Sequence, residues 1–221
     1  MLDVALVVPA LNARASIAGT LAPFCSKIRE LIVSDGGSTD GTPDEARRHG
    51  AVVVDGAPGR GGQLRRGAAA ASASWLLFLH ADTRLESDWE QAVSQAMAQG
   101  PDRAAYFRFA LDDASPKARR LESMVAWRAR AFGLPYGDQG LLISRKLYDG
   151  VGGFRDMPLM EDVDLVRRIG RRNLVAMPVR AVTSAHKFRR DGYWRRSAKN
   201  LFCLSLYFAG VNPAAIKRIY G

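Results

Sequence analysis

The sequence predicts an α/β protein whose central, mostly parallel sheet is flanked by helices. Within the first 100 residues, apolar strand-like runs and helical segments alternate four times, which is typical of a parallel sheet. The run at 4–8 is apolar throughout and ends at Pro9, as expected for a strand buried on both faces. Polar residues follow three of these strands, and ligands of such sheets bind at the carboxyl ends of the strands.

The first half alternates regularly. In order, we expect a strand at 4–8, a helix at 15–24, strands at 31–34 and 52–54 with a helix from 42 between them, a glycine-arginine loop at 59–62, a helix at 63–73, a strand at 75–79 and a helix at 88–99. The helix from 42 has the clearest start, because Pro43 occupies its first turn and Asp44 and Glu45 lie at its positive end.

The second half is less regular. We expect an exposed or mixed-sheet strand at 105–111, a basic amphipathic helix at 116–132, a strand at 140–144, a helical turn at 146–148, a helix at 160–171, a strand at 174–177 and a helical tail. No linker or repeat divides the chain. We therefore predict one domain, with a first half at 1–100, a second half at 101–190 and a C-terminal helix at 191–221.

Composition excludes several classes of protein. The 221 residues have two cysteines, Cys25 and Cys203, which form no disulfide framework and favour a reducing compartment. We expect neither a signal peptide nor a transmembrane helix, because the N-terminal apolar run is short and no run approaches about 20 residues. A cytoplasmic protein is the resulting expectation.

The net charge of +10 favours an anionic partner, although a solvated basic surface is an equal alternative. No zinc finger, ribonucleoprotein motif or helix-turn-helix accompanies the charge, so no nucleic-acid partner is expected. The tail from Lys187 mixes basic and aromatic residues, which suits a helix lying on an anionic membrane at the inner face of the plasma membrane. Packing on the domain or in a dimer is the alternative.

Asp35 ends the second strand and precedes two glycines and a hydroxyl-rich turn. Its carboxylate could accept hydrogen bonds from a nucleoside, or it could bond its own backbone in an Asx-type turn. Asp40 suits a turn or cap, and Asn12 either contacts a nucleotide or turns the chain. Arg60 and the glycines before Gln63 could bind phosphate at a helix N-terminus, or form a solvated loop.

His80, Ala81 and Asp82 end the fourth strand. Asp82 offers the hard oxygen ligand that a cation bridging a diphosphate needs, whereas His80 could be functional or structural. Further along, Glu161 and Asp162 belong to a cluster of three acids within four residues at a helix start. Such acids raise one another's pKa and suit a general base, or they could simply complement the helix dipole.

Two further segments are candidates. Asp138 and Gln139, between a helix and a strand, either contact an acceptor or form a turn. His186 follows the last strand-like run, where it could ligate a metal or contact a phosphate, or be a surface histidine.

In their order and spacing, these motifs resemble the family-2 glycosyltransferases, which have the GT-A fold. The resemblance rests on Pro9-x-x-Asn12, the segment 35–42, the arginine-glycine loop, His80-Ala81-Asp82, and Gly-Gly-Phe at 152–154 followed by Glu161-Asp162. It covers nearly 190 residues and implies that 1–100 is the nucleotide half and 101–190 the acceptor half. His80 departs from the family's Asp-x-Asp motif, and this variant looks like a bacterial glycosyltransferase-like subgroup.

The resemblance implies metal-dependent transfer of a sugar from a nucleotide-diphosphate sugar to an acceptor hydroxyl, with inversion by single displacement. It implies donor contacts at Pro9, Asn12, Asp35, Arg60, Gln63, Ala81 and Asp82. It implies Mg²⁺ or Mn²⁺ at Asp82, with His80 or His186, and Asp162 as the base beside Glu161. The basic second half favours an acidic or lipid-linked acceptor. The donor base, the sugar and the oligomeric state are left open.

Two other functions fit the same pattern. A nucleotidyltransferase would use a related α/β fold, although such enzymes usually carry a glycine-rich, basic loop after the first strand, where this chain has the segment 9–14. A non-catalytic nucleotide-binding or membrane-docking protein is the third hypothesis, and the missing carboxylate at position 80 supports it.

Overall fold

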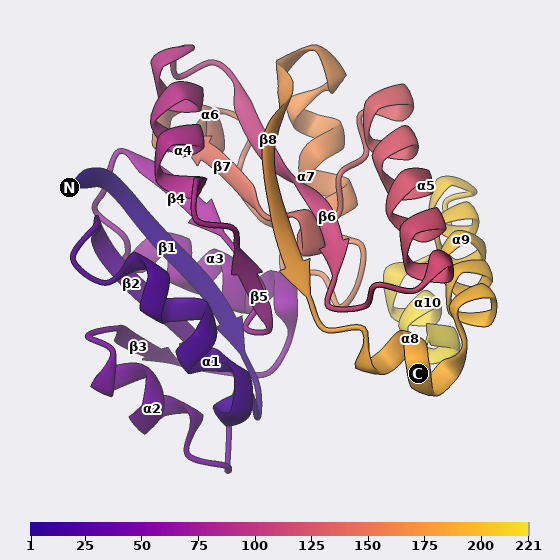
Figure 1. Ribbon diagram of the computed structural model, residues 1–221, viewed down its shortest axis with the longest axis horizontal. Helices are drawn as coiled ribbons and strands as arrows, with labels where there is room; N and C mark the ends of the chain where they lie inside the picture. Colours follow the sequence, from indigo (N-terminus) through magenta and orange to yellow (C-terminus); the bar gives the residue numbers. More distant parts are fainter. Residues whose placement is uncertain (221) are drawn as a thin grey trace.

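The computed structural model describes residues 1–220 and contains one eight-stranded sheet, ordered β3-β2-β1-β4-β7-β6-β8-β5 (Figure 1). The strands are β1 (Leu2–Ala10), β2 (Ile28–Asp35), β3 (Val52–Asp55), β4 (Trp75–Phe78), β5 (Thr83–Leu85), β6 (Ala104–Leu111), β7 (Leu141–Ser144) and β8 (Leu174–Thr183). The helices are α1 (Arg14–Leu21), α2 (Thr42–Arg48), α3 (Arg60–Ala70), α4 (Trp89–Ala98), α5 (Pro116–Phe132), α6 (Arg145–Gly150), α7 (Glu161–Ile169), α8 (His186–Asp191), α9 (Tyr193–Phe208) and α10 (Pro213–Tyr220). Short 3-10 turns are η1 (Ala22–Phe24), η2 (Gly137–Gln139) and η3 (Arg171–Asn173).

The sheet is mixed, and four of the seven strand pairings in this part of the chain are parallel. Strands β1 to β4 form the parallel portion, whereas β7 runs antiparallel to both β4 and β6. β6 and β8 are again parallel, and β5 pairs antiparallel with β8 at the far edge. The sheet therefore runs without a break through both halves of the sequence, and the predicted α/β class is confirmed.

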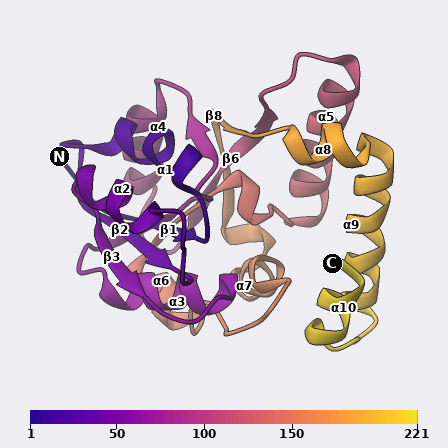
Figure 2. The same ribbon diagram turned by 90° about the horizontal axis from the view of Figure 1, so that it is seen from below.

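Helices cover both faces of the sheet, with α1, α2 and α4 on one side and α3, α6 and α7 on the other (Figure 2). The first strand shows why its run is apolar throughout. Val4, Leu6 and Val8 pack into the core on one face, and Ala5 and Val7 pack into the core on the other. Alternating side chains of a strand face opposite sides, so a strand covered twice needs no polar positions.

The structure differs from the sequence prediction in the second half. β6 is buried along most of its length, where an exposed strand was one of the two expectations. β8 continues to Thr183 instead of ending at 177. Its pairing with β6 shifts between Tyr106 and Arg108, and this irregularity accommodates Pro178, which cannot donate a ladder hydrogen bond. β5 was not predicted, because three residues give no periodic signal.

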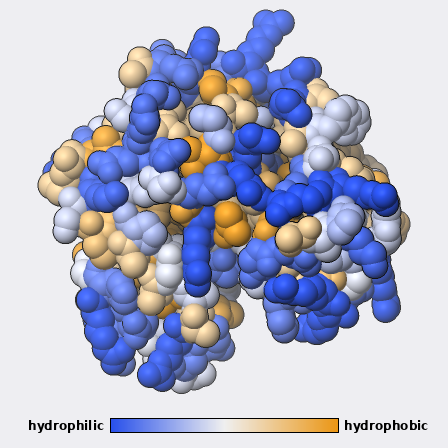
Figure 3. Space-filling model, in the orientation of Figure 1, coloured by the Kyte–Doolittle hydropathy of each residue, from blue (hydrophilic) through white to orange (hydrophobic). Residues whose placement is uncertain are grey.

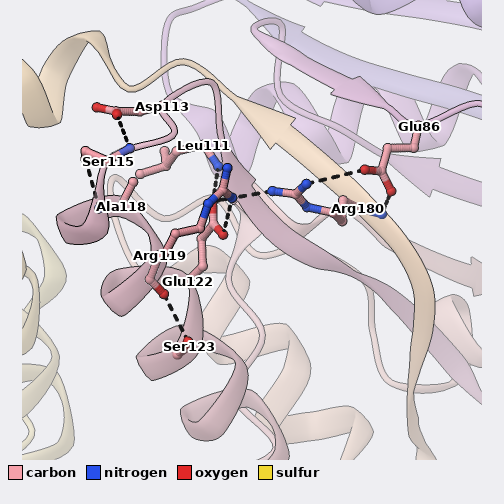
Figure 4. A network of polar contacts seen from close by, with 9 residues as sticks. All are labelled: Glu86, Leu111, Asp113, Ser115, Ala118, Arg119, Glu122, Ser123 and Arg180. Atoms are coloured by element: carbon pink, nitrogen blue, oxygen red, sulfur yellow. Dashed lines mark hydrogen bonds and ion pairs between the residues drawn. The ribbon is translucent and has the colours of Figure 1, made fainter.

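Helix α5 is fixed to the sheet through Glu122 (Figure 4). The Glu122 carboxylate accepts a hydrogen bond from the backbone N–H of Leu111 at 2.9 Å and pairs with Arg119 at 2.7 Å. It also lies 3.6 Å from Arg180 of β8, whose guanidinium is 3.6 Å from Glu86. Glu122, the single acid of α5, thus points toward the sheet, and the outer face of the helix consists of basic and apolar residues.

Candidate active site

The turn after β2 is shaped by Asp35. The carboxylate is buried, and its Oδ2 accepts hydrogen bonds from the backbone N–H groups of Gly37 at 2.8 Å and Ser38 at 2.7 Å. Its Oδ1 accepts a hydrogen bond from the Ser38 hydroxyl at 2.5 Å. These are the contacts of an Asx-type turn, the alternative interpretation of this residue. A contact with a nucleoside stays a prediction for Asp35.

The loop after β1 is joined to this turn. Asn12 has a left-handed backbone, with φ of 50°, and its side-chain oxygen accepts a hydrogen bond from the N–H of Thr39 at 3.0 Å. Asp40 accepts hydrogen bonds from the backbone N–H and the hydroxyl of Thr42, as expected for the turn alternative, and Gly41 is the N-cap of α2. The bond from the Thr42 hydroxyl lowers the pKa of Asp40. Both loops therefore form one rigid edge above the parallel strands.

Helix α3 begins at Arg60, so the glycines at 61 and 62 lie in its first turn rather than in the predicted loop. A Cβ at Gly61 would lie 2.4 Å from the backbone oxygen of Arg155, which explains the need for glycine there. Gln63 is buried, and its amide donates to the carbonyls of Ala10 at 2.7 Å and Ser34 at 2.9 Å. Gln63 thus ties α3 to the ends of β1 and β2, and a contact of Gln63 with the donor stays a prediction.

A cavity of about 170 Å³ lies at the carboxyl ends of β4 and β8. It is lined by Arg60, His80, Asp82, Tyr136, Asp138, Leu159, Met160, Glu161, Asp162, Val163, Thr183, Ser184, Lys187, Phe188, Arg196, Asn200 and Tyr220. In the orientation of Figure 1, the surface is largely hydrophilic and is hollowed at its lower edge, between the part that holds α1 and α2 and the part that holds α8 (Figure 3).

Six of the predicted site residues line this cavity, and seven do not. Those that line it are Arg60, His80, Asp82, Asp138, Glu161 and Asp162. Those outside it are Pro9, Asn12, Asp35, Gln63, Ala81, Gln139 and His186. The first group is drawn from four separate segments of the chain, so the fold brings together acids and bases that the sequence keeps apart.

His80 and Asp82 follow β4 at the edge of the sheet. The Asp82 carboxylate is exposed, and its Oδ1 accepts a hydrogen bond from the Thr183 hydroxyl at 3.4 Å. The Nε2 atom of His80 is buried without a hydrogen-bond partner. Burial, reinforced by the charges of Arg60 and Lys187, lowers the pKa of His80 well below its usual value. The imidazole is therefore neutral at physiological pH.

These two side chains fit a divalent cation that is shared with a ligand. A buried nitrogen without a partner and an exposed carboxylate both line the cavity. In residues 1–220, no three His, Cys, Asp or Glu side chains come together closely enough to hold a metal ion by themselves. Mg²⁺ is commonly held by one or two carboxylates, with phosphate oxygens and water completing its shell. His186, the other predicted metal ligand, is exposed at the start of α8 and is not among the residues that line the cavity, so its part in metal binding stays a prediction.

Glu161 and Asp162 form the first turn of α7, directly after Met160, whose backbone is left-handed with φ of 68°. Glu161 is buried, and its Oε1 lies 3.5 Å from the guanidinium of Arg60 without a hydrogen bond. Burial, and then the charge of Asp162, raises the pKa of Glu161 to about 7. Asp162 accepts hydrogen bonds from the N–H groups of Gly137 and Val163, each at 2.7 Å.

The predicted three-acid cluster is split by the fold. Asp164 turns away from the cavity and pairs with Arg168 at 2.6 Å and Arg155 at 3.1 Å. Arg168 also donates to the carbonyl of Gly153 at 2.7 Å, which fixes the glycine segment before α7. Asp164 is therefore a structural residue, because its carboxylate is held by these two arginines.

The turn η2 packs against His80 and Asp162. A Cβ at Gly137 would lie 2.7 Å from Nε2 of His80 and 3.4 Å from Oδ2 of Asp162. Burial raises the pKa of Asp138 to about 6, and its Oδ1 has no partner. Gln139 is buried, and its amide donates to the carbonyl of Phe107 at 3.1 Å and accepts from the N–H of Tyr136. Gln139 thus holds the turn, and its contact with an acceptor stays a prediction.

Sequence reasoning did not assign the contribution of the C-terminal helices to the cavity. Lys187 of α8, Arg196 and Asn200 of α9 and Tyr220 of α10 all line it. Arg196 pairs with Asp191 at 2.9 Å, and the side-chain oxygen of Asn200 is buried without a partner. The only sequence signal is the spacing of Arg196 and Asn200, which places both on one face of a helix.

The chain matches Glycosyl transferase family 2 over residues 5–160. It belongs to this family. The match ends one residue before Glu161, so the proposed catalytic pair and the C-terminal helices lie beyond it. It includes the loops after β1 and β2 and the edge of β4, which carry the sequence motifs.

Curated relatives include uncharacterized glycosyltransferases of Mycobacterium bovis and Mycobacterium tuberculosis, each 38% identical over 85 residues. This match spans 38% of the present chain and 38% of each relative.

Solved structures with the same fold include the mannosyltransferase PcManGT of Pyrobaculum calidifontis in complex with GDP-Man and Mn²⁺. It is 20% identical, with a TM-score of 0.69, and the match covers 98% of this chain and 67% of that one. Glucosyl-3-phosphoglycerate synthase of Mycobacterium tuberculosis, bound to Mn²⁺ and UDP-glucose, is 21% identical with a TM-score of 0.63, over 90% of this chain and 77% of that one. At these identities the likeness shows the fold, and the expected GT-A architecture is confirmed.

Proposed function

We propose that the protein transfers a sugar from a nucleotide-diphosphate sugar to an acceptor hydroxyl and inverts the anomeric configuration. The observation that carries this proposal is the cavity itself, where His80 and Asp82 from the edge of β4 meet Glu161 and Asp162 from the start of α7. Family membership and the sugar nucleotides bound by structural neighbours support the same reaction.

The donor would lie along the joined loops after β1 and β2, with its diphosphate toward the cavity. Pro9, Asn12, Asp35 and Ala81 would contribute to the nucleoside end, where Asn12 and Asp35 already shape the loops. Arg60 has a half-exposed guanidinium beside the cavity and would pair with the diphosphate. Gln63 would act indirectly, by holding α3 against the strand ends.

His80 and Asp82 would hold Mg²⁺ or Mn²⁺. The cation would neutralise negative charge on the leaving diphosphate when it is bound. Asp162 would accept the proton of the acceptor hydroxyl. Its two backbone hydrogen bonds fix the carboxylate in place, and Glu161 lies beside it with a pKa of about 7. Asp138, half-buried in the same cavity, would orient the acceptor.

The lining of the cavity supports an acidic acceptor. Lys187 and Arg196 come from helices α8 and α9 and line the same cavity as Asp162. Lys187 is exposed, and an anionic group on the acceptor would be attracted to it. Glycosyl transfer also requires a hydroxyl on the acceptor, and the unpartnered oxygen of Asn200 could accept a hydrogen bond from one.

The decisive variant is Asp162→Asn. We expect turnover to fall at least about a hundredfold, the usual scale for losing a general base, while donor binding changes little. The measurements are release of nucleoside diphosphate with a panel of hydroxylated acids and a thermal-shift titration with the sugar nucleotide. Asp149→Asn, an exposed carboxylate on α6, is the matched control and should behave like the wild type. Wild-type turnover in Asp162→Asn would contradict the base assignment.

A thermal-shift panel of UDP, GDP, dTDP, CDP and ADP, each with and without Mn²⁺ or Mg²⁺, tests the donor. A ligand that binds only the folded state stabilises it by about 2.7 kcal/mol at a hundredfold over its dissociation constant. We expect one nucleoside diphosphate to give a metal-dependent shift. No shift with any of the five would favour the non-catalytic alternative, and release of pyrophosphate from a nucleoside triphosphate and a sugar phosphate would favour a nucleotidyltransferase.

A further inference from the structure

The exposed large apolar side chains are concentrated at one end of the molecule. Of the eleven in residues 1–220, eight belong to the helices α5, α9 and α10. They are Met124, Trp127, Phe132, Trp194, Leu201, Phe202, Phe208 and Ile219. Single exposed apolar residues are ordinary on a soluble protein, whereas a group of this size marks an interaction surface.

Helices α5 and α9 lie beside each other at the end of the molecule away from β3, and α10 packs on α9 (Figures 1 and 2). A groove between α5 and α9 is lined by Lys117, Arg120 and Met124 from α5 and by Trp194 from α9, among others. Basic and apolar groups therefore alternate on a single surface.

Helix α9 faces outward with its apolar side. Trp194, Leu201 and Phe208 recur every seven residues, so they share one face, and all three are exposed. Cys203, on the opposite face, is fully buried, and Leu204, at one border of the exposed stripe, is buried as well. Phe208 also contacts Arg167 of α7, whose guanidinium lies 4.9 Å from the centre of its ring, whereas Trp194 and Leu201 are exposed over more than 60% of their surface.

The net positive charge of the chain is located in the same region. Helix α5 has five basic residues and one acid, and residues 186–220 have eight basic residues and one acid. Their combined excess of eleven positive charges exceeds the net charge of +10 of the whole chain. The remainder of the protein is close to neutral, so the positive electrostatic potential is concentrated at this end.

We propose that this α5–α9 surface, defined by Met124, Trp127, Trp194, Leu201, Phe202 and Phe208, docks on an anionic lipid bilayer. Aromatic and leucine side chains insert at the boundary between headgroups and acyl chains, and flanking arginines pair with anionic headgroups. In residues 1–220, no helix is both long enough and apolar enough to cross a membrane. Docking thus means lying on the surface, and it is independent of whether the cavity transfers sugar.

A second copy of the chain, rather than a bilayer, could in principle cover the α5–α9 surface. Two copies related by a two-fold axis would bring two surfaces with this same positive excess together, and like charges oppose such contact. An anionic bilayer matches both the apolar stripe and the charge.

The test is sedimentation of the full chain with vesicles of phosphatidylcholine mixed with phosphatidylglycerol, compared with phosphatidylcholine alone. We expect binding to the anionic vesicles that weakens as salt is raised. Two of the four tryptophans, Trp75 and Trp89, are buried, so a blue shift in fluorescence would report on Trp127 and Trp194. Absence of binding to the anionic vesicles would overturn the proposal.

Matched variants locate the contact. Leu201→Ser and Val52→Ser remove side chains that are exposed to nearly the same degree, 63% and 61%, but at opposite ends of the molecule. We expect Leu201→Ser, combined with Trp127→Ser, to weaken vesicle binding at least tenfold and Val52→Ser to leave it unchanged, with unaltered circular dichroism in each case. Equal binding by all variants would refute the assignment. Self-association in ultracentrifugation that only the double variant abolishes would also refute it, by showing a dimer contact.

Discussion

Replacing Glu161 by glutamine should make the protein more stable at neutral pH, although it removes a charge next to Arg60. The carboxyl is buried, with 2% of its side chain exposed, and burial raises its pKa from 4.5 to about 7. The folded protein therefore binds a proton at Glu161 more tightly than the unfolded chain does. The stability contributed by that proton is complete below pH 4.5 and is lost as pH rises through 7.

The size of the effect follows from the shift. One pKa unit corresponds to about 1.4 kcal/mol, so a rise from 4.5 to about 7 makes the loss at most about 3 kcal/mol. Glutamine cannot ionise and keeps the shape of the protonated acid. The free energy of unfolding of Glu161→Gln should thus equal that of the wild type near pH 4.5 and exceed it by up to about 3 kcal/mol at pH 8.

Urea unfolding at a series of pH values between these limits measures the difference directly. Titrating groups that do not interact with Glu161 cancel, because wild type and variant are compared at the same pH, so the difference reports on Glu161 and its charged neighbours Asp162 and Arg60. Glu90→Gln, whose side chain is about half exposed on α4, serves as the control and should give a small difference at every pH. A difference for Glu161→Gln that is constant with pH, or a wild type that is the more stable protein at pH 8, would refute the reasoning.

Three further predictions follow from the site and its support. Gly137→Ala should reduce turnover at least about tenfold, because its methyl group would overlap Nε2 of His80 and displace the turn; steady-state kinetics with unchanged circular dichroism would check this. Asp82→Ala should abolish the metal-dependent part of the thermal shift with nucleoside diphosphate, and a shift that persists would remove Asp82 from the cation site. Arg168→Met should lower the free energy of unfolding by about 3–5 kcal/mol, because it leaves the buried Asp164 without its closest partner; a loss below about 1 kcal/mol in urea unfolding would contradict this account.

Local signals explain what was predicted well. The apolar run before Pro9 and the proline and acids at the start of α2 depend on nearby residues alone, and both predicted elements are present. Local patterns also predicted that His80 and Asp82 follow a strand and that Glu161 and Asp162 begin a helix. Chain direction alone places the ends of parallel strands at one edge of a sheet.

What the sequence determined by itself is the fold class, the family and the strand ends that carry the site. Only the tertiary structure decided that Gln63 and Gln139 serve backbone carbonyls, that Asp164 turns away from Asp162, and that α8 and α9 line the cavity. These outcomes depend on pairs far apart in the chain, such as Gln63 and Ala10, which lie 53 residues apart. Periodicity and capping act over a few residues, whereas burial and partner choice are fixed when distant segments pack together.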